Sequence, residues 1–530
     1  MKRRQKNIPE LVAVRFSEKK QQVCRKKGSS RPRSSHLLKL KKSTLTSLLS
    51  CLGGLLLPVL AVVSFAEDLS TTSSSSFANG RESTTPNLFI DAPQGERQVR
   101  YNPGPFYEDD RCAPLDEIDE LAWLQMRARE GDAEAQHRLG VLYSQGHCVP
   151  QDFDEAIKWY RLAAEQGLAA SQHNLGVLYE WGQGVPRDYL EAVQWYRQAA
   201  EQGFANAQNN LGVMYINGQG VPQDDQEAVR LYRLAAEQGF AEAQYNLGVV
   251  LAEGKGLPQD FRSAAKWYRL AAEQGFPAAQ HNLGVLYFRG RGVVQDNAKA
   301  ANWLGLAAEQ GYAKAQLKLG YFYLVGQCVE QDYPAAARWL RLAAEQGNAE
   351  AQSKLGILYL EGRGVAENPE EAVKWYRLAA EQGFAEAQYN LGLLYELALG
   401  VPLDYLEAVK WYRLAAEQGF ADAQNNLGVM YLRGKGVLRD YQEGFRWCRK
   451  AAEQGDPGGQ VNLGVMYAYG HGVSQSNEQA FAWWLLAAEN GNASARTYLD
   501  MAELQWDATV LAKGRRLARQ LREEIKKNLR

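Results

Sequence analysis

The stretch YRLAAEQGFAEAQYNLG occupies residues 232–248 and returns unchanged at residues 376–392. The glycine that ends it recurs every 36 residues, at Gly140, Gly176, Gly212, Gly248, Gly284, Gly320, Gly356, Gly392, Gly428 and Gly464. A fixed period of 20–50 residues is typical of a solenoid or array. Each unit of such an array buries its apolar face against its neighbours, so the repeat outweighs the three or four domains that a length of 530 residues would otherwise suggest.

One period, residues 133–167, predicts two helices. In its first half, apolar residues fall at helical spacing: Ala135, Leu139, Leu142 and Tyr143. The run GHCVP then breaks the pattern. Asp152 stands at an N-cap position, with Glu155 three residues later as in a capping box, and Gly167 suits the left-handed position after the second helix. Each period is therefore expected to be a helix-turn-helix unit.

Two features of the period predict close packing. Gly140 and its equivalents lie inside the first helix, where glycine costs about 1 kcal/mol relative to alanine. Close approach of a neighbouring helix would explain that cost. A tryptophan recurs in the second helix, and we expect its stripe to belong to the core: Trp123, Trp159, Trp195, Trp267, Trp303, Trp339, Trp375, Trp411, Trp447 and Trp483.

The shared pattern A-x-A-Q-x-N-L-G-x-x-Y-x-x-G-x-G-V-x-x-D-x-x-x-A-x-x-W-Y-x-x-A-A-E-Q-G resembles the Sel1-like repeat, a longer relative of the tetratricopeptide repeat. The resemblance covers ten copies in residues 133–491. It implies an all-α, right-handed α-solenoid of about ten 36-residue helix-turn-helix repeats with half-repeat caps. It also implies an adaptor or scaffold that binds other proteins.

Both ends of the array depart from the pattern. Residues 112–132 match only the second half of a unit, so we expect an N-terminal half-repeat. Residues 492–530 supply an eleventh first helix, with Asp500 at the glycine position, and a closing amphipathic helix whose inward side chains would be Leu511, Leu517, Leu521 and Ile525. Atypical terminal units are expected because one of their faces meets water.

The N-terminus predicts export. The first 42 residues carry 15 Lys or Arg and two Glu, and residues 43–66 hold no charged residue. A basic region, an apolar stretch and small residues before position 67 are typical of a cleaved signal peptide, residues 1–66. An uncleaved signal anchor is the alternative, because the apolar stretch is long enough to span a bilayer. Residues 67–111 then form a Ser/Thr-rich flexible linker. We expect a periplasmic or secreted protein, or a membrane-anchored one with its repeats outside.

Charge and cysteine content argue against binding of nucleic acid, metals or cofactors. Beyond residue 66 the chain holds 45 basic and 59 acidic residues, a net charge of −14, which disfavours nucleic acid as a ligand. Cys112 and Cys148 occupy equivalent positions in adjacent units, and an exported protein could join them in a disulfide. We expect no cofactor and no metal site, since the cysteines form no C-x-x-C pair.

In tetratricopeptide superhelices the first helices line a concave groove, and the residue before Leu-Gly would point into it. That residue, which we call the ladder position, is an asparagine in most units: Asn174, Asn210, Asn246, Asn282, Asn390, Asn426 and Asn462. An asparagine can both donate to and accept from the backbone of an extended peptide. The alternative is a ladder of asparagines that bond neighbouring repeats to each other.

The ladder position changes to lysine in two adjacent units, at Lys318 and Lys354. Leu317 precedes the first lysine, and Tyr321 follows it on the same face. Two cations beside an apolar patch would suit an acidic and hydrophobic segment of a partner protein. The sequence thus predicts a partner-binding groove, whereas drift among repeats would give the same pattern without function.

We expect no catalysis. The run SAAK at residues 263–266 fits the S-x-x-K of β-lactamases and penicillin-binding proteins, but no S-D-N or K-T-G follows it. A β-lactamase-like hydrolase is therefore only an alternative, and it would require turnover that disappears in Ser263→Ala.

Overall fold

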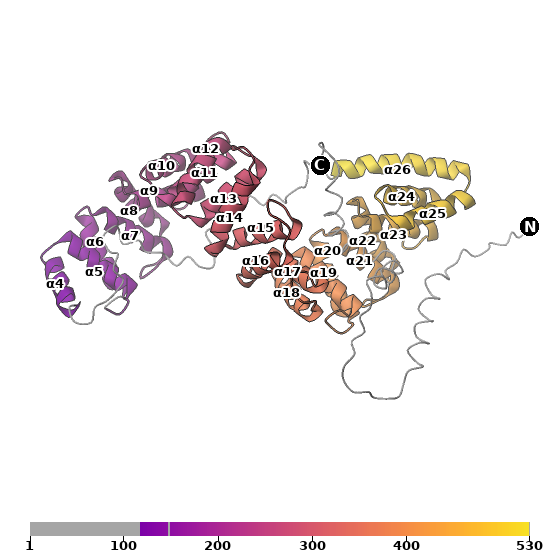
Figure 1. Ribbon diagram of the computed structural model, residues 1–530, viewed down its shortest axis with the longest axis horizontal. Coiled ribbons are helices and arrows are strands. Elements are labelled where there is room, and N and C mark those ends of the chain that lie inside the picture. Colours follow the sequence, from indigo (N-terminus) through magenta and orange to yellow (C-terminus); the bar gives the residue numbers. More distant parts are fainter. Residues whose placement is uncertain (1–116, 147–148, 529–530) are drawn as a thin grey trace, which may run out of the picture. The chain divides into compact units, whose positions relative to one another are not determined.

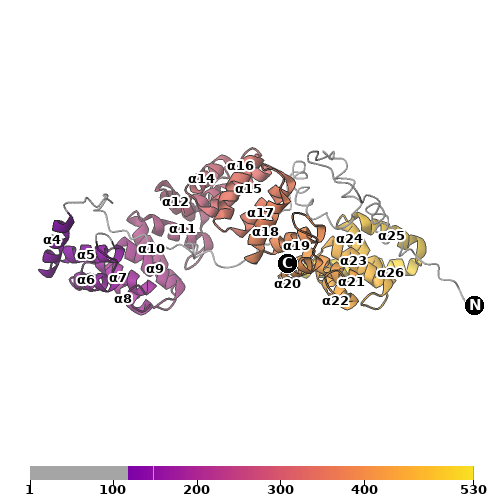
Figure 2. The ribbon, with the colours of Figure 1, turned by 90° about the horizontal axis from the view of Figure 1, so that it is seen from below.

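The computed structural model describes residues 117–146 and 149–528, and within them every regular element is an α-helix (Figures 1 and 2). The ten first helices are each 13 residues long: α5 Ala133–Gln145, α7 Ala169–Trp181, α9 Ala205–Asn217, α11 Ala241–Glu253, α13 Pro277–Arg289, α15 Ala313–Val325, α17 Ala349–Glu361, α19 Ala385–Leu397, α21 Ala421–Arg433 and α23 Pro457–Tyr469.

The second helices alternate with them and share that length: α6 Phe153–Glu165, α8 Tyr189–Glu201, α10 Asp225–Glu237, α12 Phe261–Glu273, α14 Asn297–Glu309, α16 Tyr333–Glu345, α18 Pro369–Glu381, α20 Tyr405–Glu417, α22 Tyr441–Glu453 and α24 Asn477–Glu489. Each helix packs on the next one along the chain, within a unit and across to the following unit. The structure is therefore the all-α solenoid that the period predicts. We number its units one to ten from α5.

The predicted start and stop signals set the helix bounds. Asp152 caps α6 by accepting a hydrogen bond from the backbone N–H of Glu155. The capping box is only half formed, because the Glu155 carboxylate pairs with Lys158 at 3.0 Å instead of returning to the cap. Gly167 adopts φ +92°, the left-handed conformation expected after the helix.

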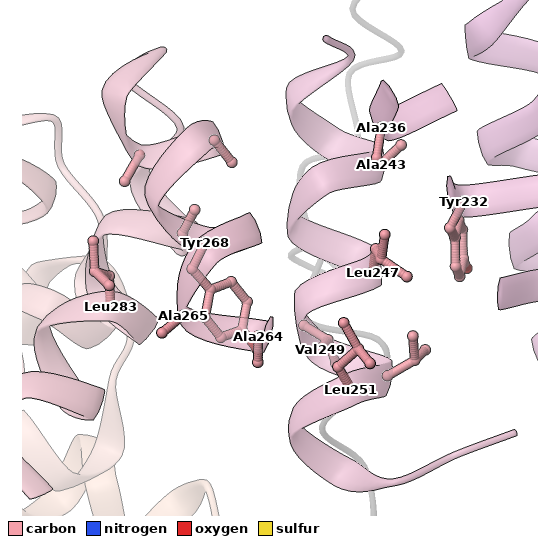
Figure 3. Packing of buried hydrophobic residues seen from close by; sticks show 14 of the residues in the cluster. Tyr232, Ala236, Ala243, Leu247, Val249, Leu251, Ala264, Ala265, Tyr268 and Leu283 are labelled. Carbon is pink, nitrogen blue, oxygen red and sulfur yellow. The ribbon is translucent and has the colours of Figure 1, made fainter. Parts of the chain in front are cut away.

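In most units the glycine inside the first helix is required by an aromatic ring, and in the others by a leucine or cysteine side chain at the same position of the second helix. A Cβ built on Gly140 would lie 2.5 Å from Cδ1 of Tyr160, and one on Gly248 would lie 2.6 Å from Cε1 of Tyr268. The atoms closest to Gly140 across the helix interface therefore belong to the Tyr160 side chain and not to the backbone of the following helix. Figure 3 shows this core in unit four, where Leu247 and Val249 of α11 lie among Tyr232, Ala264 and Tyr268 of the adjoining helices.

The tryptophan stripe is buried or half-buried within the array, but the prediction is wrong at its first member. Trp159 and Trp483 are 9% and 4% exposed. Trp123 lies on the half-repeat helix α4 (Glu117–Arg129) and is 49% exposed. The described chain places no second helix of a preceding unit against α4, so this tryptophan has less to pack on.

The C-terminal cap has two helices, α25 (Ala493–Gln505) and α26 (Ala508–Asn528). Asp500 is exposed, so no tyrosine ring presses on this equivalent of the helical glycines. The predicted inward face of α26 is confirmed, because Leu511 is buried and Leu517, Leu521 and Ile525 pack against the last units. The helix packs mainly on α24, above which it runs in Figure 1.

Candidate functional site

The ladder position lies between consecutive first helices. In several units its asparagine side chain forms a hydrogen bond to the preceding repeat. Asn246 donates to Oδ1 of Asn209 at 2.9 Å, and Asn462 donates to Oδ1 of Asn425 at 2.7 Å. In both pairs the acceptor is the residue just before the ladder position of the preceding unit. Such inter-repeat bonds satisfy amides that would otherwise be buried without partners.

The same bonding uses other partners in other units. The amide of Asn210 lies 3.2 Å from Nε2 of His173, and Asn282 bonds the hydroxyls of Tyr245 and Tyr268. Two ladder residues are buried, Asn174 and Asn426, and the others are half-buried: Asn210, Asn246, Asn282, Lys318, Lys354, Asn390 and Asn462. Several of the asparagines therefore bond one repeat to the next, among them Asn210, Asn246 and Asn462.

At the junctions around unit six, the ammonium groups of Lys318 and Lys354 both lie over the ring of Tyr321. Nζ of Lys318 lies 5.8 Å from the ring centre of Tyr321, and Nζ of Lys354 lies 5.7 Å from the same centre. Lys318 also lies over Phe288 at 5.3 Å and Phe322 at 5.7 Å. The faces of these rings carry the negative end of the aromatic quadrupole, so they attract both ammonium groups.

Polar atoms on either side of the lysines are left unsatisfied. Nδ1 of His281, one repeat before Lys318, is buried without a hydrogen-bond partner. Oγ of Ser353, directly before Lys354, also has none, and its side chain is fully buried. Buried polar atoms without partners are uncommon in native folds and call for a specific explanation. Other unsatisfied buried atoms are spread along the described units, mostly on tryptophan rings, and these two lie near the units in which lysine replaces asparagine.

A second set of substitutions accompanies the lysines, and sequence reasoning missed it. In three regular units a tyrosine of the second helix interacts with the next ladder asparagine, and the pairs are Tyr196 with Asn210, Tyr268 with Asn282 and Tyr412 with Asn426. Units five and six carry Leu304 and Leu340 in place of that tyrosine. Each leucine directly precedes a unit with a ladder lysine. Aligning the repeats by their 36-residue period would have revealed this pairing.

The aromatic contact that joins neighbouring units is also missing at the junction of units six and seven. At four other junctions an aromatic residue before the ladder position packs against one at the start of the next first helix, as in Tyr245 and Phe276, with ring centres 5.2 Å apart. The equivalent residues at this junction are Leu317 and Asn348. Asn348 instead caps α17 by accepting from the N–H of Ala351. Leu317 is left half-buried beside the lysines.

Charges around the lysines are mixed. Nζ of Lys354 lies 3.4 Å from a carboxylate oxygen of Glu350. Burial raises the pKa of Glu386, and the positive charge of Lys354 partly offsets this rise. Burial lowers the pKa of Lys314, one turn before Lys318. Burial, reinforced by the charge of Lys318, lowers the pKa of His281 to about 4, so this imidazole is neutral at pH 7. The positive charge of the site therefore comes from lysines.

The remaining candidate residues have simpler roles. Ser263 lies in the first turn of α12, where its N–H donates to Asp260 as part of the helix cap, and Lys266 is solvent-exposed. Cys328 is half-buried and adopts φ +63° at a position that is glycine in most units. The proposed partners Cys112 and Cys148 lie outside the described residues.

Neither a metal site nor a membrane span is found in the described part of the chain. Across residues 117–146 and 149–528, no group of three or more His, Cys, Asp and Glu side chains could hold a metal ion. No helix over the same ranges combines the length and apolarity needed to cross a membrane. The predicted signal segment, residues 1–66, lies outside these ranges.

Comparison with known families decides the identity of the repeat. The Sel1 repeat profile matches ten consecutive segments: 133–168, 169–204, 205–240, 241–276, 277–312, 313–348, 349–384, 385–420, 421–456 and 457–492. The chain belongs to the Sel1 repeat family. Sel1 repeat proteins are generally protein–protein interaction scaffolds, and the solenoid fold is typically non-enzymatic.

Solved structures of bacterial Sel1 repeat proteins are similar to this chain. One is a protective antigen present in uropathogenic Escherichia coli strains, 38% identical, with a TM-score of 0.50, covering 77% of this chain and 96% of its own. Another is a Sel1 repeat protein from Oxalobacter formigenes, 37% identical, with a TM-score of 0.46, covering 59% of this chain and 90% of its own. Among curated proteins, none matches this chain significantly.

Proposed function

We propose that this Sel1 repeat protein is an exported scaffold that binds an acidic and apolar segment of a partner protein at units six and seven. The observation that carries the proposal is the pair of ammonium groups, Lys318 and Lys354, held over the single ring of Tyr321. Such a pair presents two cations at one point on the inner face of the first helices. A partner carboxylate placed there would meet both.

The surroundings of the lysines support a ligand with mixed character. Leu317 and Tyr321 offer half-buried apolar surface next to the cations. Aromatic and apolar anchors beside charged groups are typical of protein-binding hot spots. The unsatisfied Oγ of Ser353 is available to a donor or acceptor of the partner if the junction opens slightly. In several other units, ladder bonds or aromatic pairs occupy the equivalent positions.

The proposed location is the periplasm or the cell exterior, and the alternative is a membrane-anchored protein that tethers an envelope complex. The basic and apolar N-terminal segment supports export. The similarity to a protective antigen of E. coli agrees with an exposed location. Cell fractionation separates the two alternatives, because a cleaved protein leaves with the soluble fraction and an anchored one stays with the membranes.

A crosslinking pull-down from intact cells tests the binding site. Wild type is compared with Lys318→Glu/Lys354→Glu and with Lys266→Glu/Lys410→Glu, which changes the net charge equally but alters exposed lysines of second helices. A milder variant, Lys318→Gln/Lys354→Gln, guards against loss of folding. The proposal expects one defined partner to be lost from both site variants and retained by the control. Capture of the same partners by all four proteins would contradict it.

A further inference from the structure

The outer surface of the second helices carries a row of exposed leucines that the proposed groove does not use. We call it the leucine stripe, and in units three to eight it consists of Leu234, Leu270, Leu306, Leu342, Leu378 and Leu414, which are 37–45% exposed. Equivalent residues of stacked units line up along a solenoid. The stripe is therefore an extended apolar row on a face remote from the ladder positions.

A glutamate accompanies each leucine of the stripe, three residues later. Glu345, Glu381 and Glu417 are examples, and all three are exposed. Over the described ranges the structure gives none of these three an ion pair. Leu and Glu at this spacing lie on the same side of a helix, so every unit presents one apolar contact beside one negative charge.

In unit ten the same two positions are occupied by the chain's own terminal helix. Leu486 is the equivalent of Leu414, but it is only 4% exposed because it lies in a cluster with Ala518, Leu517 and Leu521 of α26. Glu489 is the equivalent of Glu417, and both of its carboxylate oxygens accept from Arg522 at 2.5 Å. The basic, amphipathic helix α26 thus binds the Leu–Glu pair of unit ten.

The contact extends beyond one unit. Ile525 of α26 belongs to the same apolar cluster as Ala452 of α22, the second helix of unit nine, and its Cγ2 would lie 4.0 Å from a Cβ built on Gly455, just after that helix. The 21-residue helix α26 therefore packs along the second helix of unit ten, and its end reaches the C-terminal end of the second helix of unit nine. In unit nine the leucine is replaced by Lys450, which covers Trp447 at 4.3 Å and ends the stripe. The free stripe begins at Leu414 and runs toward the N-terminal units.

We propose that the leucine stripe of units three to eight is a second docking surface, and that its occupant is a basic amphipathic helix of a partner protein. The chemistry of that helix follows from α26: leucines at the spacing of Leu517 and Leu521, with an arginine placed like Arg522. The apolar side chains would cover the stripe, and the arginines would pair with its unpaired glutamates. A scaffold with two faces could hold two partners at once.

A peptide of residues 508–528 is the probe for this surface, because it carries the sequence that binds unit ten. Its affinity for the purified full-length chain is measured by fluorescence anisotropy. We expect Leu342→Gln/Leu378→Gln/Leu414→Gln to weaken binding by about tenfold or more. Glu345→Lys/Glu381→Lys/Glu417→Lys should weaken it as well, and added salt should weaken binding to the wild type.

Matched controls separate the stripe from general effects. Leu190→Gln/Leu406→Gln/Leu438→Gln alters leucines that are at least 59% exposed but lie off the stripe, and it should leave the affinity unchanged. Lys318→Gln/Lys354→Gln should also leave it unchanged, so failure of this proposal and failure of the groove proposal are distinguishable. Undetectable binding, or equal binding to the stripe variants, would overturn the inference. So would a dimer that the peptide disperses, since the occupant would then be a second copy of this chain.

Discussion

Two glycine-to-alanine substitutions inside helices are predicted to change stability in opposite directions. Gly392 lies in α19, where an added Cβ would stand 2.7 Å from Cδ1 and Cε1 of Tyr412 and 3.2 Å from the carbonyl oxygen of Ala408. Gly305 lies in α14, where an added Cβ would have nothing within 4 Å. The two sites therefore share helix propensity and differ in packing.

The magnitudes follow from two effects. Replacing glycine by alanine in a helix gains about 1 kcal/mol in propensity, and Gly305→Ala should realise that gain. Overpacking a buried site costs about 1–3 kcal/mol. Tyr412 cannot turn away freely, because its hydroxyl donates to the buried Glu396 at 2.9 Å. We expect the upper part of that range for Gly392→Ala, hence a net loss of about 1–2 kcal/mol.

Urea unfolding followed by circular dichroism measures both changes, and hydrogen exchange locates them. A long array need not unfold in one step, so the exchange of amides in α19 and α20 is the sharper readout for Gly392→Ala. Gly305→Ala should slow exchange in α14. If Gly392→Ala stabilised the protein as Gly305→Ala does, the tyrosine contact would not be the reason for glycine at this position.

Three other predictions concern the backbone, a buried histidine and the interrupted ladder. Ala398 ends α19 at φ +56°, where most units have glycine, so Ala398→Gly should stabilise the protein by about 1 kcal/mol and raise its melting temperature. His137 is buried against Ser171, and burial lowers its pKa to about 4; its contribution to stability is present above the unfolded pKa of about 6.5 and is lost as pH falls toward 4. The free energy of unfolding should fall by about 3 kcal/mol over this pH range. In His137→Gln, the free energy of unfolding measured in urea should depend less on pH between 6.5 and 4. Restoring the ladder with Leu340→Tyr/Lys354→Asn should protect the amides of α16 and α17 from hydrogen exchange, whereas Lys354→Asn alone should not, because the tyrosine partner would still be missing.

Much of the fold could be predicted because the determinants are local and repeated. Asp152 and Gly167 mark the bounds of a helix in any sequence, and ten copies of the pattern leave little ambiguity. The position of α26 could not be predicted in this way. Its amphipathic pattern indicates which side chains face inward, but not that they would cover Leu486 and reach α22.

The candidate site was only partly accessible from the sequence. The change from asparagine to lysine at Lys318 and Lys354 is visible in the repeat pattern. Their convergence on Tyr321 depends on side-chain directions across a junction, which no local pattern specifies. The unsatisfied atoms of His281 and Ser353 are likewise visible only once the side chains are placed in three dimensions.

Site-specific photocrosslinking tests the central claim most directly. A photoreactive residue replaces Leu317, beside the two lysines, and in a second protein it replaces Glu242, an exposed first-helix residue of a regular unit. After irradiation of intact cells, mass spectrometry identifies the crosslinked peptides. The account predicts that Leu317 captures a single partner segment containing acidic and apolar residues, and that Lys318→Gln/Lys354→Gln abolishes the capture. Capture of that partner from position 242 and not from position 317 would contradict it.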